Sequence, residues 1–379
     1  MKILIICHKN IFNPLDGGSL ASKKIFSDLK KNYNTKVICL TNQKNKSNEE
    51  NITFQINKTF SFNKLIKSFF SNKSYQAERF FSKNICNKII DIINKNQYEY
   101  ILFEGVFPAV YLEEIKKKCN CKTIIRTHNI EHEIWQGLQH NTRNIYKKFI
   151  YLFIKKQIKK WEDYICMKSD FICCISKNDI QYFTKTLKKD IKLLPVSFTV
   201  KKRQKNTEFS IFHLGSMDWK PNIEGINWFI DKVWSKFTEK KFSIDCYLAG
   251  KNMPDNIKKK KTRQLIIEGT VENATKYMHN KSVMIVPVFS GSGIRIKILE
   301  GMALGIPIIS TSKGAKGIAY KNGENILIAD DELSFYNSII KLYSDPILFK
   351  KISNGGKELI KNKFSSEIVI EKWNNLIKS

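Results

Sequence analysis

A glycine-rich turn lies between an apolar run and a helical pattern near residue 290. The run 283–289 is typical of a buried strand, the turn is Ser290-Gly-Ser-Gly293, and residues 294–304 have helical spacing that ends at Gly305. This arrangement presents free backbone N–H groups and the positive end of a helix dipole to an anion, typically a phosphate. A tight turn between a strand and a helix also needs glycine for steric reasons alone, so the surrounding residues decide between the two interpretations.

One carboxylate follows this turn in a basic stretch. Glu300 is the only Asp or Glu between Asn273 and Gly323, a stretch that holds seven Lys and Arg residues. Gly293, Lys297 and Glu300 are spaced i, i+4, i+7, so we expect the two side chains on the same side as the turn. A carboxylate placed there can accept hydrogen bonds from ribose hydroxyls. A surface ion pair between Lys297 and Glu300 explains the spacing equally well.

Strand-like runs alternate with helical patterns along almost the whole chain, which predicts parallel sheets with both faces covered. The predicted strands are 2–7, 35–41, 52–56, 100–104, 123–127, 171–175, 210–214, 243–248, 265–267, 283–288, 307–310 and 326–329. A polar stretch at 196–208 interrupts the alternation and is typical of a linker. We therefore predict an α/β fold of two Rossmann-like domains facing each other across a cleft, with ligands bound beyond the carboxyl ends of the strands.

The predicted domains are residues 1–198, residues 199–365 and a C-terminal helix at 366–379 that packs back toward the N-terminal domain. In the first domain we expect a helix at 19–31 with Ser19 as its N-cap. Glu131 and Glu133 are expected to begin a helix that runs past Trp135.

Composition excludes several classes of protein. Of the 379 residues, 42% are hydrophobic and 12% aromatic, which excludes a disordered chain. No apolar run approaches the roughly 20 residues that span a bilayer, and the first strand is too short for a signal peptide. Nine scattered cysteines fit reduced thiols. We therefore expect a cytoplasmic protein.

The net charge of +30 is spread over both halves of the chain. It indicates either attraction to polyanions or a compositional bias whose lysines only solvate the surface. No nucleic-acid-binding motif accompanies the charge, so we expect no nucleic-acid partner. The spacing of His and Glu around residue 130 does not place ligands on one helix face, so we expect no metal site.

Residues 286–311 resemble the donor-binding signature of glycosyltransferase family 4 and its GT-B relatives, through Pro287, the glycine turn and the run from Arg295 to Pro307. The resemblance continues in order through the second half, at 215–222, 248–250, 269–271 and 323–330. In the first half it rests on Asp16-Gly-Gly18 and on the segment 126–129. It implies the GT-B fold and transfer of a sugar from a nucleotide-diphosphate sugar, linked to UDP or GDP, with no cofactor.

In this family resemblance Glu300 corresponds to the second Glu of a Glu-x(7)-Glu motif, which holds the nucleotide ribose. The first Glu, which contacts the donor sugar in relatives, is replaced by Ser292 here. The family's Arg and Lys after strand 210–214 are also missing, so diphosphate stabilisation falls to Lys220, Arg295 or Lys297. The donor-binding residues implied are Gly17, Gly18, Lys220, Ser292, Gly293, Arg295, Lys297 and Glu300.

His128 follows the predicted strand 123–127 and resembles the family's active-site His near the sugar. We expect it to be catalytic; a cap or a core-edge residue is the alternative. Glu104, at the end of the preceding strand, either orients an acceptor hydroxyl or caps the next helix. Relatives retain the anomeric configuration without a metal, by letting the leaving phosphate take the acceptor proton, and we expect the same here.

The resemblance implies a glycan or lipid-linked acceptor and a role in bacterial cell-surface polysaccharide or glycoconjugate synthesis. The alternatives are a GT-B-like nucleotide-sugar epimerase, a non-catalytic protein of the same fold and a polyanion-binding protein. Two segments mix aromatic and basic residues, 60–81 and a predicted helix at 146–165. They suit an anionic membrane surface, which would make the protein peripheral on the inner face of the cell membrane. The alternative is that the apolar stripe of the helix packs on the domain core.

Overall fold

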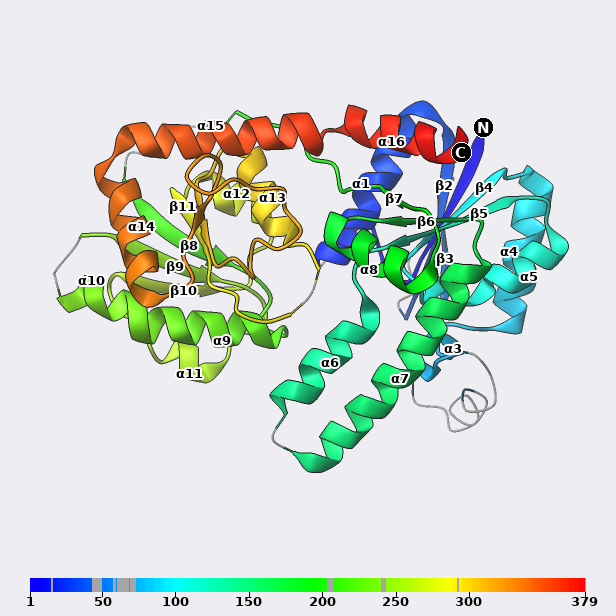
Figure 1. Cartoon of the computed structure of the whole chain (residues 1–379), viewed down its shortest axis with the longest axis horizontal. Helices are drawn as coiled ribbons and strands as arrows, with labels where there is room; N and C mark the ends of the chain where they lie inside the picture. Colours follow the sequence, from blue (N-terminus) through cyan, green and yellow to red (C-terminus); the bar gives the residue numbers. More distant parts are fainter. Residues whose placement is uncertain are drawn as a thin grey trace. The chain divides into compact units, whose positions relative to one another are not determined.

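The computed structural model describes residues 1–14, 16–42, 50–56, 59, 68, 73–142, 144–202, 208–239, 243–291 and 293–378. The chain forms two compact units, each built on its own sheet (Figure 1). Unit 1 comprises residues 1–197 together with 369–379, and unit 2 comprises residues 198–368. Each unit is an α/β domain with a parallel sheet.

Unit 1 has a seven-stranded sheet in the order β3-β2-β1-β4-β5-β6-β7, and every neighbouring pair is parallel. The order reverses between β1 and β4, so the connections that follow these two strands diverge and leave room at the carboxyl edge. The strands are β1 (Lys2–Cys7), β2 (Asn34–Thr41), β3 (Asn51–Gln55), β4 (Tyr100–Glu104), β5 (Lys122–Thr127), β6 (Phe171–Cys174) and β7 (Ile191–Leu193).

Both faces of this sheet are covered, which explains why its strands are continuous apolar runs. Alternate residues of β1 enter two different clusters: Ile3 and Ile5 pack with α1 and α16, and Leu4 and Ile6 pack with α4, α5 and α7. Trp373 of the last helix is fully buried on the first of these faces and contacts the ring of Tyr100. The C-terminal helix therefore packs on unit 1.

The helices of unit 1 are α1 (Gly17–Asn32), α3 (Tyr75–Glu78), α4 (Lys83–Asn96), the 3-10 helix η1 (Pro108–Tyr111), α5 (Leu112–Lys118), α6 (Glu131–Asn141), α7 (Ile145–Lys168), α8 (Lys177–Leu187) and α16 (Ser366–Lys378). The predicted N-cap of the first helix was wrong. Asp16 caps α1, and Ser19 completes a capping box three residues later, because Gly17 and Gly18 already adopt helical geometry.

Unit 2 has a six-stranded parallel sheet in the order β10-β9-β8-β11-β12-β13. Its strands are β8 (Ser210–Leu214), β9 (Asp245–Ala249), β10 (Leu265–Gly269), β11 (Val283–Val286), β12 (Ile308–Ser310) and β13 (Leu327–Ile328). Its helices are α9 (Lys220–Trp228), the π-helix η2 (Phe229–Trp234), α10 (Ser235–Glu239), α11 (Asp255–Lys258), α12 (Ala274–His279), α13 (Ile296–Ala303), α14 (Glu332–Ser344) and α15 (Pro346–Lys363). The order reverses between β8 and β11, so the connections after these two strands mark the expected ligand site.

The boundary between the two units, at residues 197 and 198, falls inside the predicted linker. The first residues of the predicted linker at 196–208 are packed: Phe198 is buried and its N–H donates to the carbonyl of Phe364, while 203–207 lie outside the described residues. The helix predicted at 146–165 lies within α7, and the burial of its apolar residues changes along its length: Tyr146 is exposed, while Trp161 is fully buried.

Candidate functional site

In unit 1 the predicted catalytic residue, His128, follows β5 directly, and Glu104 ends the neighbouring strand β4. The register pairs Glu104 with Arg126, so these side chains meet at the carboxyl edge of the sheet. His128 Nε2 lies 2.7 Å from Glu104 Oε2. The Glu104 side chain is wholly buried and that of His128 is 11% exposed. Glu104 therefore holds the imidazole of His128 on the side that faces the core, and the other side of the ring is accessible to solvent.

Glu104 binds three side chains within the protein. Its carboxylate accepts hydrogen bonds from Ser22 Oγ at 2.8 Å and from Arg126 Nη1 at 3.0 and 3.1 Å, besides its contact with His128. Arg126 is equally buried and donates to the carbonyls of Leu194 and Pro195. Burial alone would raise the pKa of Glu104, but the charge of Arg126 and the contact with His128 lower it to about 2.

This network decides the chemistry of the imidazole. Because Glu104 is ionised at neutral pH, His128 Nε2 carries a proton and donates it, which leaves Nδ1 as the ring atom for other partners. The prediction that Glu104 orients an acceptor hydroxyl would require an accessible carboxylate. The structure gives it no exposed surface, and its geometry instead makes Glu104 a positioning residue for His128.

The N-terminus of α1 lies beside His128 Nδ1. A Cβ atom built on Gly18 would lie 3.6 Å from Nδ1 and 3.1 Å from Lys9 Nζ, so the absence of a side chain leaves this space open. Asp16 caps the helix and pairs with Lys9 at 2.8 Å. Gly17 and Gly18 form the first turn, whose N–H groups have no intrahelical acceptors. The structure thus brings the predicted glycines and His128 together.

A second buried network next to His128 was missed. Glu131 was predicted to begin a helix, and it is the first residue of α6. Its N–H donates to Glu162 Oε1 at 2.9 Å, and Glu162 Oε2 lies 2.7 Å from His132 Nδ1. Burial, reinforced by Glu162, raises the pKa of Glu131 to about 7. No local signal could have found this network, because Glu162 comes from α7.

In unit 2 the predicted glycine turn connects β11 to α13. Gly291 and Gly293 both have positive φ, +94° and +79°, and a Cβ on Gly291 would lie 2.5 Å from Trp219 Cζ2. Glycine at 291 is therefore required by conformation and by space. Ser292, the position of the missing first Glu, lies outside the described residues.

Arg295 stands between this turn and the first residue of α13. Its guanidinium lies 4.2 Å from the ring centre of Trp219, and Nη1 donates to the Gly293 carbonyl at 3.1 Å. Burial lowers the pKa of Arg295 to about 10, so the side chain remains charged at neutral pH. A cation stacked on an aromatic ring is held in one orientation. Arg295 is thus a fixed positive charge beside the turn.

Glu300 is 13% exposed and binds two side chains. Oε1 accepts from Thr275 Oγ1 at 3.0 Å and Oε2 from Lys297 Nζ at 2.9 Å. The ion pair between Lys297 and Glu300, which was the alternative interpretation of their spacing, is present. The expectation that both side chains lie on the same side as the glycine turn stays a prediction. Gly293 is not part of the helical stripe, because α13 begins only at Ile296.

Lys220 begins α9 and pairs with Glu224 at 3.5 Å, with its side chain 48% exposed. Glu224 Oε2 also accepts a hydrogen bond from Ser290 Oγ at 3.4 Å. The Glu224 carboxylate therefore links Lys220 to the first residue of the glycine turn. Strand β8 contributes a further polar atom that no sequence pattern indicated. Buried His213 donates from Nδ1 to the Ile285 carbonyl, and burial lowers its pKa to about 4, so Nε2 is a neutral acceptor.

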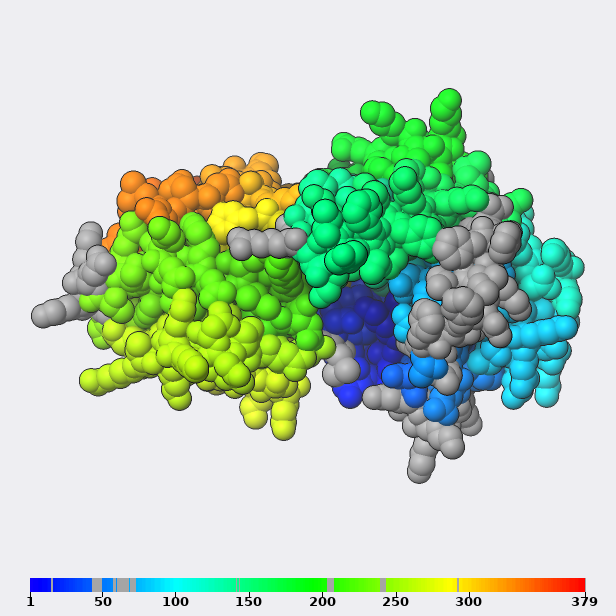
Figure 2. All heavy atoms as spheres, turned by 90° about the horizontal axis from the view of Figure 1, so that it is seen from below, coloured from blue at the N-terminus to red at the C-terminus, as the bar shows by residue number. Residues whose placement is uncertain are grey.

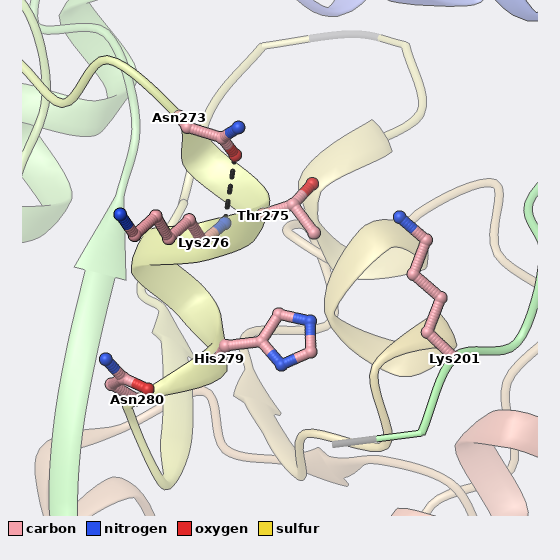
Figure 3. A pocket seen from close by; sticks show the side chains of 6 residues that line it. All are labelled: Lys201, Asn273, Thr275, Lys276, His279 and Asn280. Carbon is pink, nitrogen blue, oxygen red and sulfur yellow. Dashed lines mark hydrogen bonds between the residues drawn. The ribbon is translucent and has the colours of Figure 1, made fainter. Parts of the chain in front are cut away.

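A hollow of about 480 Å³ opens beside α12 (Figure 3). In Figure 3, Lys201 stands across from the α12 face that carries Thr275 and His279. The same Thr275 holds Glu300, so the hollow adjoins that carboxylate. Cations and amides line it, and no carboxylate is among its lining residues, which are Lys201, Asn273, Thr275, Lys276, His279 and Asn280. The lining suits a polar or anionic ligand.

Across the described residues, no group of three or more His, Cys, Asp or Glu side chains gathers as metal ligands do. Within the same residues, no helix is long and apolar enough to cross a membrane.

Comparison with known proteins identifies the kind of domain that unit 2 contains. Residues 208–345, within unit 2, match the model of the family described as glycosyl transferases group 1. An uncharacterized 44.6 kDa protein in the cps region of Klebsiella pneumoniae is 25% identical over 293 residues, which are 74% of this chain and 72% of that protein.

Solved structures match the whole chain. They include sucrose-phosphate synthase from Thermosynechococcus elongatus (TM-score 0.72, 14% identity, 100% of this chain and 98% of that chain). A TarM variant from S. aureus, in complex with fondaparinux, alpha-GlcNAc-glycerol and UDP, has a TM-score of 0.71 at 13% identity and full coverage of both chains. HepE from Anabaena in complex with UDP has a TM-score of 0.69 at 11% identity, again with full coverage.

At these identities the structural likeness shows the fold, and the family match shows a group 1 glycosyltransferase domain in unit 2. The chain is therefore a glycosyltransferase with the GT-B fold. The predicted α/β class with two Rossmann-like domains is confirmed. Membership of family 4 and retention of the anomeric configuration stay predictions.

Proposed function

We propose that the chain transfers a sugar from a UDP- or GDP-linked donor to a glycan or lipid-linked acceptor, with retention and without a metal. The products would be cell-surface polysaccharides or glycoconjugates. The Klebsiella relative is described as a protein in the cps region, which supports this setting. The solved relatives TarM and HepE, described in complex with UDP, support a nucleotide-diphosphate sugar as donor.

The observation that carries the proposal is the arrangement of Glu300, the glycine turn and Arg295 on one helix end. A diphosphate at the turn would receive backbone N–H groups, the helix dipole and the fixed charge of Arg295. Thr275 orients one oxygen of Glu300, and the other pairs with the partly exposed Lys297. Ribose hydroxyls can donate to this carboxylate while the Lys297 ammonium turns toward the diphosphate.

The chemistry of the proposed step follows from the leaving group. The acceptor oxygen bonds to the anomeric carbon, the bond from that carbon to the diphosphate oxygen breaks, and the acceptor proton passes to the departing phosphate. Positioning and charge stabilisation supply most of the rate in such a step. Arg295, Lys297 and Lys220 are the cations of unit 2 that would balance the negative charge.

Unit 1 would contribute His128. Glu104 fixes the Nε2–H tautomer, so Nδ1 is the atom that would contact a hydroxyl of the transferred sugar. Such a contact acts mainly in the transition state, when charge develops on the sugar ring. A lipid-linked acceptor would place the protein on the inner, cytoplasmic face of the cell membrane.

The test is the release of nucleoside diphosphate from UDP- and GDP-sugars, with and without a glycan or lipid-linked acceptor fraction. The proposal predicts release that depends on the acceptor. Conversion of the donor sugar without acceptor would indicate an epimerase. Binding of the donor without any turnover would indicate a non-catalytic protein of this fold. Absence of both binding and turnover would leave the polyanion-binding alternative.

A further inference from the structure

The first half of α7 exposes a continuous apolar face. Figure 1 shows α6 and α7 side by side, extending beyond the sheet of unit 1, and in Figure 2 their teal and green side chains lie at the surface. Five large apolar side chains there are between 37% and 77% exposed: Ile145, Tyr146, Phe149, Ile150 and Phe153. These residues occupy about 140° of the helix circumference at 100° per residue, so they form one face.

The fully buried part of α7 follows this face along the helix. Ile158, Trp161 and Ile165 are fully buried, and their mean direction around the helix axis is roughly 120° from that of the exposed residues. Helix α6 is not the cover for the exposed face. Its Trp135 contacts the ring of Tyr151, which lies on the buried side. The apolar residues of α7 therefore serve two purposes, with core packing in the second half and an exposed face in the first.

The charges around this face have one sign. No carboxylate occurs between Glu133 and Glu162, and six lysines lie between residues 147 and 160. Lys147, Lys148, Lys156 and Lys160 are exposed. A second copy of the chain would bring the same lysines against them, which disfavours self-association. An anionic lipid surface accepts both features, because its headgroups pair with lysines while its acyl region takes aromatic side chains.

We infer that the α7 face, defined as Ile145, Tyr146, Phe149, Ile150 and Phe153, docks on an anionic lipid bilayer with its lysines among the headgroups. The inference rests on the proposed function only where it links this surface to a lipid-linked acceptor. The second aromatic and basic segment predicted for this purpose, 60–81, lies mostly outside the described residues. Its described residues Phe80 and Phe81 pack against the core of unit 1 and are not part of the docking surface.

The test is flotation of the full chain with vesicles of phosphatidylcholine alone or of equal parts phosphatidylcholine and phosphatidylglycerol. We expect binding only to the anionic vesicles. It should weaken markedly between about 0.1 M and about 1 M salt, as the screening length falls from about 10 to about 3 Å. The double variant Tyr146→Ser/Phe149→Ser should bind at least about tenfold more weakly, since two aromatic rings leave the interface. Ile347→Ser is the matched control, because Ile347 is 83% exposed in unit 2 and lies outside this face.

The inference would be overturned if the chain bound neither kind of vesicle or bound both equally. It would also be overturned if Ile347→Ser lost as much vesicle binding as the double variant. Self-association of the wild type that the double variant abolishes would also overturn it, in favour of an interface between copies. Nucleoside-diphosphate binding by the same variants separates this test from that of the proposed function. It should be unchanged when vesicle binding is lost, and its absence in the wild type would count against the proposed function alone.

Discussion

Replacing Glu104 by Gln tests whether the buried network around His128 is as strong as its geometry indicates. The change keeps the size of the side chain but removes the charge that faces Arg126, which is also wholly buried. Breaking one partner of a buried ion pair typically costs about 3–5 kcal/mol, because it leaves an uncompensated charge. We therefore expect a large loss of stability in unit 1.

The pKa of Glu104 gives an independent magnitude. A value of about 2 in the folded protein, against an ordinary value of 4.5, corresponds to roughly 3 kcal/mol of unfolding free energy. Because the folded pKa is depressed, this stability is fully present above pH 4.5 and is lost as the pH falls toward 2. The cost of Glu104→Gln should therefore be about 3 kcal/mol at pH 7 and less than half of that near pH 3.

Urea unfolding of wild type and variant at both pH values measures this difference. Glu114→Gln is the control, because Glu114 forms an exposed pair with Lys117 whose loss should cost less than about 1 kcal/mol at either pH. A cost below about 1 kcal/mol for Glu104→Gln at pH 7 would show that the buried charge of Glu104 does not stabilise unit 1. So would a cost that does not change with pH.

Four further substitutions, one of them a control, probe other parts of the structure. His128→Ala should lower kcat by about 10²-fold and should change nucleoside-diphosphate affinity little. Steady-state kinetics measures the first effect and calorimetry the second. If kcat stays within a factor of a few of the wild-type value, His128 has only a structural role. Glu131→Gln should raise the free energy of unfolding, and the gain should grow as the pH rises from about 5 to about 8. The reason is that the pKa of Glu131 is raised to about 7, so its ionisation disfavours the folded state. A gain that does not depend on pH in urea unfolding would contradict this. Gly225→Ala should lower the thermal midpoint strongly, because its Cβ would lie 1.6 Å from the Pro287 carbonyl oxygen. Gly137→Ala, with no atom within 4 Å of its Cβ in α6, should raise stability by roughly 0.5–1 kcal/mol; equal effects of the two glycine changes would show that close packing at Gly225 is not the cause.

The fold was predictable because its strands carry their own signal. Buried parallel strands are continuous apolar runs, and β1, β4 and β8 begin and end where the runs do. The strand β7, Ile191–Leu193, was not predicted, because Lys192 in its middle interrupts the apolar run that is typical of a buried strand. Ser19 was assigned as an N-cap because sequence alone does not show that two glycines have already entered a helix.

The site was predictable where neighbouring residues in the sequence define it and not where distant elements meet. Local spacing places Lys297 beside Glu300. Thr275, which holds the other oxygen of Glu300, comes from another helix, and no local pattern points to it. The role of Glu104 was misjudged for the same reason, since its burial depends on Arg126 and Ser22. Burial and long-range hydrogen bonds are properties of the folded chain.

The central claim is that unit 2 holds a nucleoside diphosphate with Glu300 on the ribose. Calorimetric titration of UDP and of GDP into wild type, Glu300→Ala and the control Glu324→Ala tests it most directly. Glu324 forms an exposed ion pair with Lys321, so its replacement should leave the nucleotide affinity unchanged. The account predicts that wild type and control bind one of the two nucleotides equally, and that Glu300→Ala binds it more weakly by about 1.5–3 kcal/mol, or roughly 10- to 150-fold. Unchanged affinity in a folded Glu300→Ala variant would contradict it.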